Sequence, residues 1–187
     1  ALLLWLLRIR RNTSAVAATV LLLPQLGLVY DNLIVALGSS IGLGALLQAL
    51  SWPRFWIHWL CGTWLIIAAG SILRLARFGW AQSRAAMASF CVLAVGLTAL
   101  ELSHLWTAKL YPVCEKGLLR YSTAVTPAQF CQPDQLAVAG QFPLPAIITC
   151  LVVVIAGAVL LWRRGFPWMF IGGVLMFLSA APPAAKL

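Results

Sequence analysis

The chain has 187 residues, of which 63% are hydrophobic and 9% are charged, and its formal net charge is +9. This composition excludes an ordinary water-soluble domain, which could not cover so much apolar surface. A nucleic-acid-binding role is also excluded, because the basic residues stand in short clusters between apolar runs, a pattern that reports membrane topology. The bilayer is the expected environment and membrane lipid the expected partner.

The long apolar runs lack strand-like alternation and therefore favour helices over a transmembrane barrel. The sequence predicts an all-α fold in which residues 1–187 form one transmembrane domain, a polytopic helical bundle of about five membrane-spanning helices. The predicted spans are residues 15–37, 53–75, 85–110, 144–162 and 167–181, and the one sizeable loop is 111–141. Pro24 predicts a kink in the first span, and Pro53 suits the first turn of the second.

Residues 1–7 and the loop 111–141 lie outside the predicted spans. Residues 1–7 are too short to span a bilayer, so they are either the tail of a removed segment or an interfacial helix. The loop 111–141 is rich in Pro, Gln, Ser and Thr, which predicts irregular structure.

Arginine positions predict the orientation of the bundle. If the spans alternate, one side receives Arg8, Arg10, Arg11, Arg74, Arg77, Arg84, Arg163 and Arg164. The other side receives Arg54, Lys109, Lys116, Arg120 and Lys186, which are fewer and more dispersed. The positive-inside rule then places the N-terminus in the cytoplasm and the 111–141 loop on the non-cytoplasmic side.

Cysteine usage agrees with that orientation. Cys114 and Cys131 are the two cysteines of the polar loop, and a non-cytoplasmic loop permits a disulfide between them. Cys61, Cys91 and Cys150 fall within predicted spans, where buried thiols usually serve packing.

Rare ionisable residues inside the spans are the candidate functional site. Asp31, His58, Glu101 and His104 all fall within predicted spans, where a charged group at the helix centre costs about 3 kcal/mol. Counting residues from the span ends places all four in one layer, roughly 8 to 14 Å below the outer surface. Neighbouring polar residues that could support this layer are Tyr30, Asn32, Arg54 and Ser103.

Four interpretations of the layer remain open. The four side chains could bind zinc, iron or manganese, since Glu101 and His104 have a known ligand spacing. They could perform acid–base catalysis without metal. His58 and His104 could ligate haem or a chlorophyll-type pigment. They could also do no more than join neighbouring helices through hydrogen bonds.

The stretch VYDNLIVALGSSIGLGALLQALSWPRFWIHW, residues 29–59, resembles the repeat of the small membrane lycopene cyclases of bacteria and fungi. In that family an aspartate, an apolar run and a glycine end one helix, and a proline-led acidic motif begins the next. Asp31, Gly38 and Pro53 match this frame, whereas Arg54 and Phe55 replace the acidic pair. The resemblance implies proton-initiated cyclisation of an isoprenoid, with Asp31 or Glu101 as the acid.

These observations lead to one preferred hypothesis and one rival. The preferred hypothesis is a small intramembrane enzyme that acts on a lipid or isoprenoid substrate near the outer leaflet, through acid–base or metal-assisted chemistry at the four ionisable residues. The rival is a subunit of a larger membrane complex, either non-catalytic or carrying haem or pigment. A transporter is disfavoured because the sequence contains no internal repeat.

Overall fold

The computed structural model describes residues 2–12, 16–140 and 142–180, apart from the side chains of Leu2, Asn12, His104 and Ala180. Lys186 and the outermost residues of several predicted segments lie outside this set. The described helices are α1 (Leu2–Asn12), α2 (Val16–Ile41), α3 (Ala45–Cys61), α4 (Trp64–Leu75), α5 (Arg84–Leu105), α6 (Leu144–Arg164) and α7 (Trp168–Ala180). Two short 3-10 helices, η1 (Trp80–Gln82) and η2 (Pro127–Gln129), and two strands, β1 (Tyr111–Glu115) and β2 (Leu118–Ser122), complete the fold.

The fold is mostly helical, and several helices could cross a membrane. Helices α2, α5 and α6 are each long and apolar enough, and the bent pair α3–α4 makes a fourth candidate if it counts as one span. Helix α7 has only 13 residues, so it is about 20 Å long, which is less than the hydrocarbon thickness of about 30 Å. The described residues therefore give three or four candidate spans, and the predicted number of five is not confirmed.

The second predicted span differs most from the structure. Helix α3 begins at Ala45 instead of residue 53, because the turn at Gly42, with φ of 79°, ends α2 soon enough for a helix to restart there. Pro53 consequently lies inside α3 and does not begin it. The span then breaks at Gly62 and Thr63, and α4 continues at an angle of 44°. Helix α5 also ends earlier than predicted, at Leu105 instead of residue 110.

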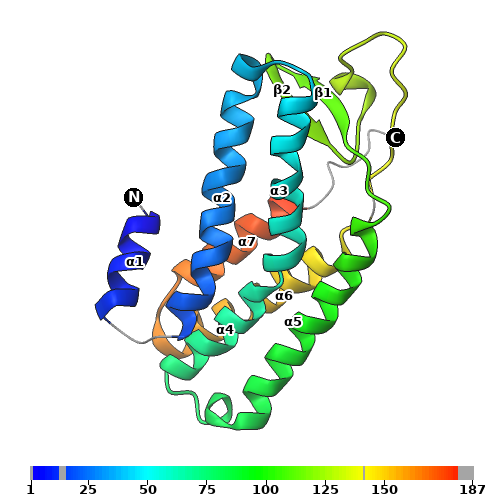
Figure 1. Ribbon diagram of the computed structural model, residues 1–187. Coiled ribbons are helices and arrows are strands. Elements are labelled where there is room, and N and C mark those ends of the chain that lie inside the picture. Colours follow the sequence, from blue (N-terminus) through cyan, green and yellow to red (C-terminus); the bar gives the residue numbers. More distant parts are fainter. Residues whose placement is uncertain (1, 13–15, 141, 181–187) are drawn as a thin grey trace.

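Helices α2 and α3 stand side by side and carry the β-hairpin at their common end (Figure 1). In the turn before Pro53, the hydroxyl of Tyr30 donates a hydrogen bond to the carbonyl of Leu50 at 2.8 Å. Below the hairpin, a small core gathers Ile34, Leu47, Leu110 and Tyr121. This core fixes the register of the two helices with respect to each other and to the hairpin.

The hairpin is the main element that the sequence did not predict, since residues 111–141 were expected to be irregular. Strands β1 and β2 pair antiparallel with Glu115 opposite Leu118, so Lys116 and Gly117 form a two-residue loop. Both loop residues have positive φ, 50° and 82°, as a type I′ turn requires. The Lys-Gly pair between two apolar segments was the signal for this turn, and the surrounding polar composition concealed it.

The hairpin lies directly on α2. A Cβ atom at Gly38 would stand 1.8 Å from the backbone carbonyl oxygen of Leu119, so the backbones of α2 and β2 touch at this point. One residue further, the hydroxyl of Ser39 donates to the carbonyl of Gly117 at 2.7 Å. Only glycine permits this approach, and the hydrogen bond secures the tip of the hairpin beside it.

Replacing Gly38 by alanine is therefore expected to destabilise the fold by about 1–3 kcal/mol, because the backbone of β2 must move away from α2. Gly96 in α5 provides a matched control, since a Cβ there would meet nothing within 4 Å. Gly96→Ala should leave the stability unchanged or raise it by about 0.5–1 kcal/mol. Denaturant unfolding in detergent micelles measures both effects, and equal stability of the two variants would disprove the contact.

The other end of the molecule is built by α4, α5, α6 and α7. Its core contains Ala69 and Leu73 of α4 and Ala156 and Leu160 of α6. Helix α7 folds back on α6 so closely that a Cβ at Gly157 would stand 2.5 Å from the backbone nitrogen of Phe170. Small residues thus allow close helix packing, as is common where the surrounding medium supplies little hydrophobic driving force.

Candidate functional site

The centre of the candidate site is an ionic cluster between α2 and α3. Along α2, Gly27, Asp31, Ile34 and Gly38 recur at helical spacing and share one face. Along α3, Arg54 and His58 are four residues apart and share the facing side. The carboxylate of Asp31 pairs with the Nε of Arg54, and its second oxygen lies 3.8 Å from Nε2 of His58.

Burial differs sharply among these three side chains. The Arg54 side chain is 9% exposed and that of Asp31 is 21% exposed, whereas His58 is 51% exposed. Arg54 also lies over the ring of Phe55, with its guanidinium carbon 5.6 Å from the ring centre. Asp31 and Arg54 therefore form an internal support, and His58 is the member of the cluster that faces outward.

His58 lines a cavity of about 550 Å³. The walls come from α3 (Phe55, His58 and Trp59), from Glu101 of α5, from residues 107–109 and Tyr111, and from Pro143 and Pro145 at the start of α6. Thr123, Ala124, residues 138–140 and Phe142 complete the lining. Volumes of this size are typical of small-molecule sites, which combine apolar walls with a few polar groups.

Glu101 is the second predicted site residue that lines this cavity, so α3 and α5 contribute an imidazole and a carboxyl group to one space. Asp31 lies behind His58 and is not part of the lining. The side chain of His104 lies outside the described residues. The structure thus brings together three of the four predicted residues, two in the cavity wall and one in contact with His58.

Of the four predicted supporting residues, two make contacts between α2 and α3 and two do not. Arg54 contacts Asp31 directly, and Tyr30 ties α2 to α3 one position before Asp31. Asn32 donates instead to the carbonyl of Leu28 in its own helix. Ser103 likewise donates to the carbonyl of Leu100 in its own helix. These last two side chains take no part in the ionic cluster, because each completes a hydrogen bond within its own helix.

A metal centre is not supported by the described residues. Among them, no group of three or more His, Cys, Asp or Glu side chains lies close enough to hold a metal ion. The predicted ligands Asp31, His58 and Glu101 therefore do not form a metal site by themselves. The physical reason is their arrangement, since Asp31 is held by Arg54 behind the imidazole and does not enter the cavity.

Residues 106–140, which we call the cap, cover one side of the cavity. Cys114 and Cys131 form a disulfide, as predicted, which joins β1 to the segment after η2. The Gln135 side chain strengthens the same link, because it accepts from the Cys131 amide at 2.8 Å and donates to the Pro112 carbonyl at 2.7 Å. A bridge between Val125 and Val138 then positions the cavity-lining residues 138–140.

An exposed acidic residue helps to order the cap. The amide of Gln129 donates to the Glu115 carboxylate at 2.8 Å, and Arg120 lies 3.4 Å from the same oxygen. These two partners, Gln129 foremost, lower the pKa of Glu115 below its usual value. The carboxylate therefore joins β1, β2 and η2 while it is ionised.

Removing the disulfide is expected to loosen the cap. The bond closes a separation of 17 residues, for which chain entropy gives a loss of about 3 kcal/mol in Cys114→Ser/Cys131→Ser. The single variant Cys91→Ser is the matched control, because Cys91 is a free thiol in α5. Thermal unfolding with and without reductant measures the effect, and a wild-type melting temperature that reductant leaves unchanged would contradict it.

Sequence reasoning did not identify several residues that shape the cavity. Phe55 and Trp59 flank His58 on α3, and their ring centres are 5.6 Å apart. Their spacing of four residues was a usable signal, because it places both rings on the face that carries His58. Lys109 and Tyr111 had no comparable signal, since the path of the cap decides where they lie.

The comparisons with known proteins add no assignment to this geometry. No protein-family model matches the chain, and neither a curated protein nor a solved structure matches it.

Proposed function

We propose that this chain is a small integral membrane enzyme that carries out proton transfer on a lipid or isoprenoid substrate bound in the cavity beneath the cap. The observation that carries the proposal is the placement of His58 and Glu101 in the wall of one cavity of about 550 Å³, with Asp31 and Arg54 behind the imidazole. An imidazole and a carboxyl group in the wall of one cavity can serve as the acid and the base of general acid–base catalysis.

The roles of the three groups follow from their positions. Asp31 is occupied by Arg54 and His58, so it suits the task of orienting the imidazole. His58 and Glu101 line the cavity, so both can exchange protons with a bound substrate. His104, one turn further along α5, is a further candidate from the sequence.

The cavity walls indicate the kind of substrate. Phe55, Trp59, Tyr111 and Phe142 provide aromatic surface, and Lys109 is the one basic side chain in the described lining besides His58. This combination fits an apolar molecule with a single polar or anionic end. The resemblance of residues 29–59 to the lycopene cyclases favours an isoprenoid, with Glu101 better placed than Asp31 to serve as the acid.

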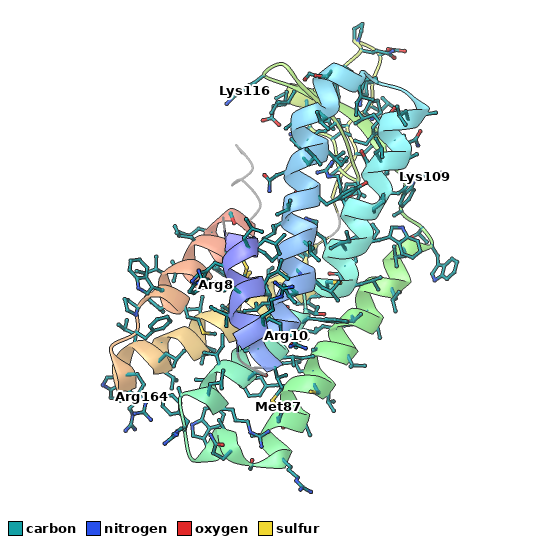
Figure 2. All side chains as sticks on the ribbon, turned by 60° about the vertical axis from the view of Figure 1, so that its left-hand side comes forward. Arg8, Arg10, Met87, Lys109, Lys116 and Arg164 are labelled. Atoms are coloured by element: carbon teal, nitrogen blue, oxygen red, sulfur yellow. A yellow bond between two sulfur atoms is a disulfide. The ribbon has the colours of Figure 1, made fainter. Side chains whose placement is uncertain are left out.

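The proposed topology has the N-terminus in the cytoplasm and the cap on the opposite side. The arginine clusters at the ends of α4 and α6 support this orientation through the positive-inside rule. Figure 2 shows Arg8, Arg10 and Arg164 in the half of the molecule away from Lys116, which lies in the cap. A substrate in the cavity would then enter from the outer leaflet.

Lipid profiling tests the function. Purified protein in nanodiscs is incubated with membrane lipid and isoprenoid fractions, and products are identified by mass spectrometry. Wild type should form a new product, and Asp31→Asn, His58→Ala, Glu101→Gln and His104→Ala should reduce it. Wild-type turnover in all four variants would disprove the proposal. A haem or chlorophyll absorption band in the purified protein would favour the pigment-carrying subunit instead.

A further inference from the structure

The end of the molecule opposite the cap carries a concentration of arginines without acidic partners. Five arginines lie at the end of α4, before or at the start of α5, and at the end of α6: Arg74, Arg77, Arg84, Arg163 and Arg164. The four acidic residues of the chain are Asp31, Glu101, Glu115 and Asp134, and none falls between residues 32 and 100 or after residue 134. Among the described residues, none of these five guanidinium groups forms an ion pair.

Two of these arginines line a surface groove of about 580 Å³ between α4 and α6. Its floor is apolar and includes Leu75, Leu160 and Phe166, and its charged members are Arg77 and Arg164. The groove thus joins an apolar track to two guanidinium groups.

Side-chain contacts hold Arg164 at this groove, and Arg77 lies in the turn beside it. Arg77 has a φ of 57°, an uncommon conformation for a residue with a side chain, in the turn that follows α4. Arg164 donates from Nη2 to the carbonyl of Ala76 at 2.6 Å and lies over the Phe78 ring at 5.6 Å. Its guanidinium is therefore held in place while its other N–H groups remain available to a ligand.

We infer that this groove binds one anionic phospholipid, with its phosphate between Arg77 and Arg164 and an acyl chain along the apolar floor. Guanidinium groups match phosphate oxygens in geometry and charge, and basic pockets between membrane helices favour acidic headgroups. Exposed tryptophans at the same end, Trp80, Trp162 and Trp168, are suited to headgroup depth. This inference is independent of the cavity beneath the cap and of any activity there.

Native mass spectrometry of the detergent-solubilised protein tests the inference. Phosphatidylglycerol and phosphatidylcholine of equal chain length are added in turn, and the retained lipid is counted per chain. Wild type should retain one phosphatidylglycerol in preference to phosphatidylcholine. Arg77→Gln/Arg164→Gln should weaken that binding by roughly thirtyfold, as the loss of two charges near a headgroup predicts.

A matched double variant separates a local site from general surface charge. Arg84→Gln/Arg163→Gln removes the same charge from the same end, and Arg163 stacks on Trp162 outside the groove lining. This control should bind phosphatidylglycerol nearly as well as wild type. An equal loss in both double variants would overturn the inference, as would wild-type binding that does not distinguish the two lipids.

Two further measurements complete the design. Arg77→Gln alone preserves the hydrogen bond of Arg164 to Ala76, so it should weaken lipid binding without lowering the melting temperature of lipid-free protein. Inorganic phosphate is added as a competitor. If millimolar phosphate alone displaces phosphatidylglycerol completely, the apolar floor contributes nothing and the inference of a phospholipid is wrong.

Discussion

Replacing His58 by alanine is expected to lower lipid turnover by about a hundredfold or more, which is the usual loss when a positioned acid or base is removed. The imidazole is half exposed to the cavity and lies 3.8 Å from Asp31, so its removal should affect chemistry more than folding. The rate of product formation at saturating substrate, with protein amount fixed by quantitative gel, measures the effect.

The partner variant and the control make this result specific. Glu101→Gln should lower the turnover rate by a similar factor. The double variant His58→Ala/Glu101→Gln should be only slightly less active than the less active single variant, because the effects of groups that act together are not additive. Ser103→Ala is the control on the same helix, since its hydroxyl only bonds to its own helix at Leu100. A Ser103 variant as inactive as the Glu101 variant would point to a disturbed α5 instead of lost chemistry.

Replacing Asp31 by alanine is expected to cost about 3–5 kcal/mol of stability, because it leaves the Arg54 guanidinium buried without its carboxylate. The Arg54 side chain is 9% exposed, and its Nη1 already has no hydrogen-bond partner among the described residues. Removing Asp31, which is the partner of this Nε, leaves the buried guanidinium charge without a carboxylate. Denaturant unfolding in micelles, followed by tryptophan fluorescence, measures the difference from wild type.

A second substitution should restore most of that loss. Asp31→Leu/Arg54→Leu removes both charges together, and such apolar replacements of buried pairs are often close to neutral. The double variant should therefore be several kcal/mol more stable than Asp31→Ala alone. It should also be inactive if Asp31 orients His58. A double variant as unstable as the single one would show that the pair contributes packing only.

The sequence predicted that Asp31 and His58 lie at a similar level along neighbouring helices, but it did not predict which residues surround them. Helical rise alone places Asp31 and His58 at a similar level on consecutive helices, and in the structure the two side chains meet. Counting residues along a helix gives the level of a side chain but not the partner that it faces. Arg54 was expected near this layer and does pair with Asp31, whereas Asn32 and Ser103, expected there for the same reason, bond within their own helices.

The parts that escaped prediction depend on contacts between distant segments. The cavity exists because residues of the cap lie against α3 and α5, and no local pattern in residues 106–140 encodes that placement. Gly38 is a similar case, since its close approach to Leu119 joins segments about 80 residues apart. Local signals did suffice for the disulfide, where the redox environment and the spacing of Cys114 and Cys131 pointed to the same bond.

The break in the helix after Cys61 lies close to His58 and therefore to the cavity. The carbonyl of His58 accepts the Gly62 amide at 3.0 Å, so the residue that carries the imidazole also holds the last hydrogen bond before the 44° bend. Glu101 lies on α5, which is one continuous helix. The hydroxyls of Thr63 and Thr98, 2.6 Å apart, connect the break to that helix. His58 thus lies one turn before the bend, while Glu101 lies on the helix that the bend contacts, so the angle between α3 and α4 contributes to the separation of the two side chains across the cavity.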